Sequence, residues 1–171
     1  MGYGLQVELD LEIEDVPDFL HWSSKGMLDA LAMDYEVHGF CSILDNVAER
    51  LNLDVSLLHK VTNPERNLND FIGGIDPDDQ EELKKWEQEF RDFEQRREIA
   101  WQPPTGIREC IEALIQELDN HPNVYEEVGV DPDPYGNYFL LGAFRRDLDK
   151  LHKIVSWADQ NEVPQLRLIW L

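Results

Sequence analysis

The chain has 171 residues, of which 36 are acidic and 15 basic, so its formal net charge is −21. Affinity for the phosphate backbone comes from clustered Lys and Arg, so this balance argues against a nucleic-acid-binding protein. Hydrophobic residues make up 42% of the chain, enough for the core of one domain spanning residues 1–171, and no apolar run is long enough for a membrane helix.

The first residues and the cysteines bear on the cellular compartment. Residues 1–5 lack the basic and apolar regions of a secretory signal, and two cysteines are fewer than a disulfide-dependent secreted domain usually carries. Cys41 and Cys110 both stand among apolar residues at helical spacing, which is typical of buried free thiols. We therefore expect a cytoplasmic protein.

The N-terminal segment has the pattern of a half-buried strand. From about residue 3 to residue 13 apolar and polar residues alternate, so the apolar side chains share one face of a pleated strand. The other face carries a ladder of four carboxylates: Glu8, Asp10, Glu12 and Glu14. Like charges on one strand face repel, so we expect this ladder to meet water or a cationic partner.

Helices are predicted for most of the chain between residues 16 and 160. Apolar residues recur at three- and four-residue steps in four long segments, about 40–51, 77–98, 105–121 and 144–158. Shorter helices fit the segments around residues 16–32 and after Asp54. Residues 62–76 and 122–137 are turn-rich by composition. Residues 138–141 fit either a short strand or the entrance to the last helix.

The C-terminal segment, residues 165–171, is too apolar for a loose tail and fits a strand. We predict an α+β fold: a predominantly helical single domain with a small sheet that contains the N-terminal (about 3–13) and C-terminal (about 165–171) strands. Such a pair needs a third strand or covering helices for stability. Arg167 is the one charged residue of the final strand, and if that strand neighbours the first, Arg167 would lie against the ladder of Glu8, Asp10 and Glu12 and relieve part of its repulsion.

Signatures of catalysis and of metal binding are missing from the sequence. The five histidines and two cysteines form no zinc-binding spacing, and no nucleophile elbow, phosphate loop or dinucleotide-binding motif occurs. Residues 131–142 resemble a calcium loop in part, but Tyr135 and Gly142 stand where oxygen ligands are needed. We therefore name no catalytic residue, no metal ligand and no cofactor.

Aromatic residues suggest where a partner protein could bind. The stripe Trp86, Phe90 and Phe93 along residues 77–98 is expected to belong to the core. Trp101, in an expected loop, and Trp157, off the main stripe of the last helix, are better candidates for exposed anchors, because Trp is enriched among interface hot spots.

The distribution of charge supports our leading functional hypothesis. Residues 1–137 carry a net charge of −22 and residues 138–171 a net charge of +1. The electrostatic field of such a negative charge steers cationic partners toward the protein. Bacterial immunity-type inhibitors combine this size and charge with a lack of catalytic motifs. The sequence thus favours a non-catalytic acidic protein that binds a basic protein through Glu8, Asp10, Glu12, Glu14, Trp101 and Trp157.

Three other interpretations stay open at this stage. The negative charge could serve solubility alone, as in a protein adapted to a salt-rich cell. Clustered carboxylates could serve a small carboxylate- or metal-dependent hydrolase. Exposed tryptophans could hold together an oligomeric structural protein, since the sequence leaves the oligomeric state undetermined.

Overall fold

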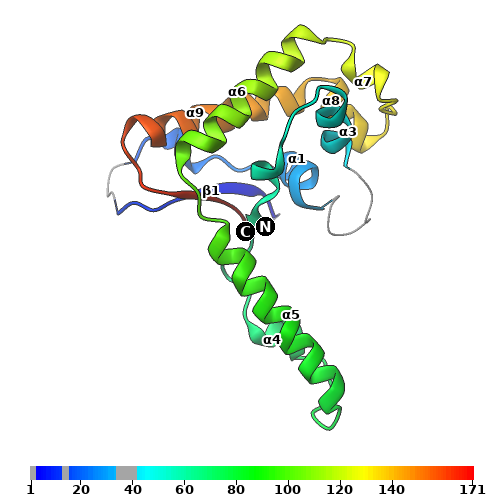
Figure 1. Ribbon diagram of the computed structural model, residues 1–171, viewed down its shortest axis with the longest axis vertical. Coiled ribbons are helices and arrows are strands. Elements are labelled where there is room, and N and C mark those ends of the chain that lie inside the picture. Colours follow the sequence, from blue (N-terminus) through cyan, green and yellow to red (C-terminus); the bar gives the residue numbers. More distant parts are fainter. Residues whose placement is uncertain (1–2, 13–15, 34–41) are drawn as a thin grey trace.

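The computed structural model describes residues 3–12, 16–33 and 42–171. It shows a helical body built around one small sheet, from which a helical hairpin projects (Figure 1). The predicted α+β fold, mostly helical with a small sheet, is therefore confirmed. Within the described residues, no helix is both long enough and apolar enough to cross a membrane.

The two terminal strands pair with each other as predicted. β1 (Leu5–Leu9) runs antiparallel to β3 (Leu166–Trp170), and Glu8 lies opposite Arg167 in the register. Both strands are shorter than the predicted segments, residues 3–13 and 165–171. One further ladder bond follows β1, from the Asp10 N–H to the Gln165 carbonyl at 2.9 Å, and residue 13 lies outside the described residues.

A third strand, β2 (Val61–Thr62), completes the sheet in the order β1-β3-β2 and runs parallel to β3. The sequence pattern instead assigns Val61 to a short helix after Asp54. That helix is the single 3₁₀ turn η3 (Ser56–His59), after which the chain becomes extended. Val and Thr are β-branched and fit an extended backbone, so ladder bonds to β3 prevail over the helical spacing.

The remaining helices include the four long predicted ones, at 43–50, 80–99, 104–120 and 143–160, and three short ones, at 68–72, 124–127 and 134–140, that lie wholly or partly in segments predicted to be turn-rich. In chain order the remaining helices are η1 (Asp18–His21), α1 (Lys25–Leu28), η2 (Asp29–Met33), α3 (Ile43–Arg50), α4 (Leu68–Ile72), α5 (Gln80–Ile99), α6 (Pro104–Asn120), α7 (Val124–Glu127), α8 (Pro134–Leu140) and α9 (Ala143–Gln160). η2 is a π-helical turn that continues α1. Residues 138–140, for which a strand was one alternative, belong to α8, and Gly142 with φ 78° separates α8 from α9.

The core of the body lies where α6 and α9 pack against each other and against α1, α3 and the sheet. The stripe expected to face inward on the last helix is fully buried: Phe144, Leu148, Leu151, Val155 and Ala158. The apolar stripe of α6 meets it, with Ile107, Ile111 and Leu114 completely inaccessible to solvent. Amphipathic spacing therefore predicted the buried face of each helix correctly, whereas the pairing of α6 with α9 comes from the tertiary structure.

The projecting hairpin consists of α4 and α5 and is called the arm below (residues 63–100; Figure 1). Two residues of the α5 aromatic stripe pack here against Phe71 of α4, whose ring centroid is 5.3 Å from that of Phe90 and 5.4 Å from that of Phe93. Among the described residues, the core cluster of the body does not include these rings. The stripe thus forms a separate small cluster, where we expected it to join the main core.

Candidate partner-binding surface

Arg167 brings two of the sequence-predicted site residues together. Its Nε lies 2.6 Å from Oε2 of Glu8, and its guanidinium carbon lies 4.5 Å from the ring centroid of Trp101. Only 12% of the Arg167 side chain is exposed, so the cation is held between the carboxylate and the indole. Glu8 and Trp101 are far apart in sequence but contact the same guanidinium.

The rest of the carboxylate ladder has a different environment. Asp10 and Glu12 are exposed, whereas Glu14 lies outside the described residues. Arg167 therefore compensates the ladder at Glu8 and leaves the charges beyond the end of β1 facing solvent. This is the outcome that repulsion between neighbouring carboxylates favours.

The base of the arm is fastened to the same part of the sheet. Gln102, the residue after Trp101, exchanges two backbone hydrogen bonds of 2.9 Å with Leu166, the first residue of β3. Its side-chain amide also donates to the carbonyl of Leu57 at 3.3 Å. Trp101 is half-buried beneath Arg167, so it links the arm to the ladder rather than standing free in a loop.

The far end of the arm carries the densest run of negative charge on it, which we call the acidic tip (residues 76–82). It contains five carboxylates and no basic residue, and all seven of its residues are exposed. Two of the acids order the turn locally: Oδ1 of Asp76 accepts from the Asp78 N–H, and Oδ1 of Asp79 accepts from the Glu82 N–H, both at 3.0 Å. Acids at the N-terminus of α5 also interact favourably with the helix dipole.

Trp157 lies in another place, in a groove between η1, α6 and α9. It is half-buried and packs against the core of the body. The charged groups beside it are already engaged: Asp159 accepts from the Thr105 hydroxyl at 2.8 Å, and its other oxygen lies 2.9 Å from Nε of Arg108. The structure therefore does not join Trp157 to Glu8 and Trp101.

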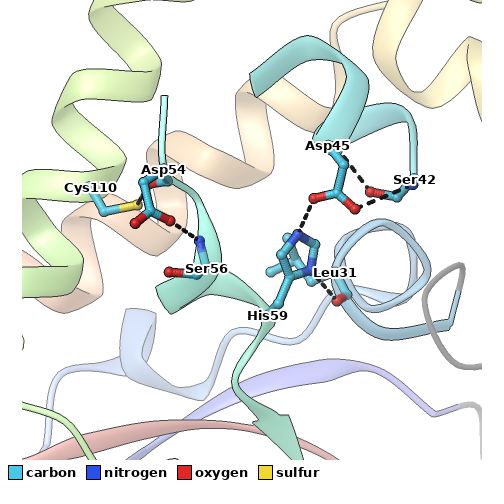
Figure 2. Close-up of polar contacts among 7 residues, drawn as sticks. All are labelled: Leu31, Ser42, Asp45, Asp54, Ser56, His59 and Cys110. Carbon is cyan, nitrogen blue, oxygen red and sulfur yellow. Dashed lines mark hydrogen bonds and ion pairs between the residues drawn. The ribbon is translucent and has the colours of Figure 1, made fainter. Parts of the chain in front are cut away.

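The sequence analysis missed an acid–histidine pair, Asp45 and His59, that Figure 2 shows in contact. Nε2 of His59 lies 2.7 Å from Oδ1 of Asp45, and Nδ1 lies 2.9 Å from the carbonyl oxygen of Leu31. A carbonyl accepts but does not donate, so Nδ1–H is the donor to Leu31. The Asp45 carboxylate lies within hydrogen-bond distance of the other ring nitrogen, Nε2.

This pair fastens three elements together. Asp45 also closes the capping box of α3: its N–H donates to Oγ of Ser42 at 3.1 Å, and its Oδ2 accepts from the Ser42 N–H at 3.3 Å (Figure 2). His59 thereby joins η3 to α3 and η2. A catalytic base presents a ring nitrogen to a nucleophile, whereas both nitrogens here contact Asp45 and Leu31, so we assign the pair a structural function. No spacing rule connects residues 14 apart, so only the tertiary fold reveals them.

Cys110 is a free and half-buried thiol whose Sγ lies 3.5 Å from the carbonyl oxygen of Asp54. Burial, with a smaller effect from the Asp54 charge, raises the pKa of the thiol to about 11. The thiolate is the nucleophilic form, so Cys110 is unreactive near neutral pH. Cys41 lies outside the described residues.

The segment with the partial calcium-loop pattern, residues 131–142, contains the helix α8. Asp133 caps α8, with its Oδ1 accepting from the Gly136 N–H at 2.7 Å. Across the described ranges, no group of three or more His, Cys, Asp or Glu side chains is placed to hold a metal ion.

Comparisons of the chain with models of protein families, with curated proteins and with solved structures found no match.

Proposed function

We propose that the chain is a non-catalytic, acidic binding protein that recognises a basic protein in the cytoplasm, in the manner of an inhibitor or immunity protein. The recognition surface runs from the strand ladder, Asp10 and Glu12, past Trp101 at the base of the arm to the acidic tip.

The acidic tip is the observation that carries the proposal. α5 has 20 residues, about 30 Å at the rise of an α-helix, and all of them are described. It buries a single one, Phe93, and holds the five tip carboxylates away from the body (Figure 1). The core of the body does not require such a projection, but recognition of another molecule explains it.

Electrostatics supply the recognition step in this proposal. A net charge of −21 attracts a basic protein from a distance, and charges on a projecting element meet it first. Screening by salt weakens such an attraction, since the Debye length falls to about 8 Å at physiological ionic strength. Affinity for the partner should therefore fall as salt rises.

The test is affinity capture from lysate of the native host, at low and at physiological salt, with quantitative mass spectrometry. The tip variant combines Asp78→Asn, Glu81→Gln and Glu82→Gln and keeps Asp79, which caps α5. The matched control variant combines Glu109→Gln, Glu126→Gln and Asp131→Asn, three exposed acids of the body. Both variants lose three negative charges.

We expect one basic protein to be captured in stoichiometric amount, less of it at higher salt, and less of it again with the tip variant. The control variant should retain the partner. Capture of generic basic proteins alone, or equal losses with the two variants, would show that the charge serves solubility and that the tip is not a recognition surface.

The two other classes considered from the sequence give different results in simple measurements. A metal-dependent hydrolase would be stabilised by a divalent ion at concentrations well below those that screen charge. An oligomeric structural protein would show a multiple of the 20.0 kDa chain mass in light scattering.

A further inference from the structure

A small cavity of about 140 Å³ lies between the α1–η2 segment and α8, apart from the arm and the ladder. Its size is close to that of protein cavities that take a benzene-sized ligand. The residues that line it are mostly aromatic or small: Gly26, Asp29, Ala30, Pro134, Tyr135, Tyr138 and Phe139. Among these, Asp29 is the one that carries a charge.

Tyr135, Tyr138 and Phe139 form the aromatic wall of the cavity, and polar contacts behind this wall hold it in place. The Tyr138 hydroxyl donates to Oδ2 of Asp147 at 2.9 Å, and the Ser24 hydroxyl donates to the same oxygen at 2.6 Å. Burial, and after it the Asp147 charge, raise the pKa of Tyr138, so the hydroxyl keeps its proton and remains a donor. Phe139 packs edge-on against Tyr138, with ring centroids 5.6 Å apart.

Gly26 is needed for this arrangement. A Cβ atom at this position would overlap the ring of Tyr138. The backbone of α1 therefore approaches the aromatic wall as closely as a residue without a side chain allows. Tyr135, by contrast, is 55% exposed, so the wall has one ring that can close over a ligand from the solvent side.

Asp29 gives the cavity its chemical preference. It is half-buried, and burial raises the pKa of its carboxyl group, against the smaller opposing effect of Lys25 one turn earlier. The carboxylate is thus incompletely hydrated, and a cation in the cavity would restore favourable interactions. A cation beside aromatic rings gains further from their quadrupoles.

We propose that this cavity is a binding site for an alkylammonium group, with Asp29 as its counter-ion and Tyr135, Tyr138 and Phe139 as its aromatic wall. The site goes beyond the proposed function, because it does not involve the acidic tip. Two sources could supply the ammonium: a free quaternary amine such as choline, or the side chain of a lysine or methyl-lysine in a protein.

The first test compares choline with its neutral isostere 3,3-dimethylbutan-1-ol, by titration followed through the NMR signals of Tyr135 and Tyr138. We expect choline to bind at least about tenfold more tightly, because the isostere fills the same volume without the charge. Equal affinities for the two compounds, or no shift with either, would overturn the proposal.

Two variants locate the site. Asp29→Asn should lower the affinity for choline about tenfold while keeping the shape of the side chain, and Gly26→Ala should lower it by displacing Tyr138. Glu126→Gln, which removes one exposed carboxylate elsewhere, is the matched control and should bind as the wild type does. Unchanged binding by Asp29→Asn would contradict the assignment.

Two further probes, N-acetyl-lysine methylamide and its trimethyl form, distinguish the two sources of the ammonium group. Tighter binding of either than of choline would assign the cavity to a protein side chain, and the reverse order would assign it to a free amine. These titrations need no protein partner and leave the acidic tip unchanged. Their failure would therefore not affect the result of the capture experiment with the tip variant.

Discussion

At the scale of single residues, Arg167 has the most consequential side chain of the sheet. It is nearly buried and pairs with Glu8 while stacking on Trp101. We expect Arg167→Ala to lower the free energy of unfolding by about 2 kcal/mol, because the variant loses a charge-assisted hydrogen bond and a cation–π contact. Urea denaturation followed by tryptophan fluorescence measures this change.

Arg91→Ala is the matched control for that measurement. Arg91 forms an ion pair with Glu87 on α5, but 64% of its side chain is exposed. Exposed pairs contribute well under about 1 kcal/mol. Equal losses in the Arg167 and Arg91 variants would show that the contact between the arm and the ladder adds nothing to stability.

Asp29 offers a second residue-scale prediction, on pH. Its pKa in the folded protein is raised, mainly by burial, so the folded chain holds the proton more tightly than the unfolded chain. Ionisation of Asp29 therefore costs stability as pH rises through the interval between the two pKa values. Asp29→Asn should raise the free energy of unfolding at pH 7 by a few tenths of a kcal/mol, after solvent screening.

The gain should shrink as the pH falls through the ordinary pKa of an aspartate and vanish at about pH 2.5, where the carboxyl is protonated in both the folded and the unfolded wild type. Urea titrations over this pH range test the sign. Glu126→Gln makes the same change in net charge at an exposed position, so it separates the local effect from relief of general repulsion. A gain that persists at low pH, or that Glu126→Gln reproduces, would contradict this explanation.

At the scale of elements, the arm should open independently of the body. Its aromatic cluster consists of Phe71, Phe90 and Phe93, with Arg66 placed 4.4 Å from the centroid of Phe71. So small a cluster supports local rather than global unfolding. Phe71→Ala should speed amide hydrogen exchange in α5 and leave α6 and α9 unchanged.

Native-state hydrogen exchange with mass spectrometry resolves these helices. Ile111→Ala provides the contrast, because Ile111 is fully buried between α6 and α9 and its truncation should speed exchange throughout the body. If Phe71→Ala sped exchange in α6 and α9 as much as in α5, the arm would be part of the same cooperative unit as the body.

At the scale of the whole molecule, the net charge of −21 should destabilise the folded state at low ionic strength. Sodium chloride should therefore raise the melting temperature, and relief of about 1 kcal/mol would move it by about 2–4 °C in a chain of this size. Magnesium chloride at matched ionic strength should act similarly, since the described part of the chain holds no cluster of three metal-binding side chains.

Thermal melts in the two salts measure this prediction. A rise in melting temperature at magnesium concentrations far below those that screen charge would contradict it. That result would favour the hydrolase interpretation over the binding protein.

The sequence predicted one of the two strand pairings in the sheet and missed the other. The alternation in residues 3–13 and the apolar run at 165–171 predicted the β1–β3 pair and a contact of Arg167 with the carboxylate ladder. The structure contains the pair and shows that Glu8 is the residue of the ladder that Arg167 contacts. β2 was not predicted, because two residues show no period and depend on β3 for their hydrogen bonds.

The sequence named candidate binding residues but could not show which of them lie together. Glu8 and Trp101 were named from charge and loop position, and the structure joins them through one guanidinium. Trp157 has the same residue type but lies in another groove, since helix phase and packing partners place a side chain that composition cannot.

The sequence by itself determined the helix-rich α+β fold, the terminal strand pair and the strongly negative charge. These features follow from periodicity and composition, which do not depend on how the chain packs. Only the tertiary structure decided that the α5 stripe packs in an arm outside the main core, that His59 reaches Asp45, and that Asp29 lines a cavity together with aromatic rings of α8. Each of these depends on contacts between segments whose separation in sequence carries no spacing signal, so packing of the whole chain decides them.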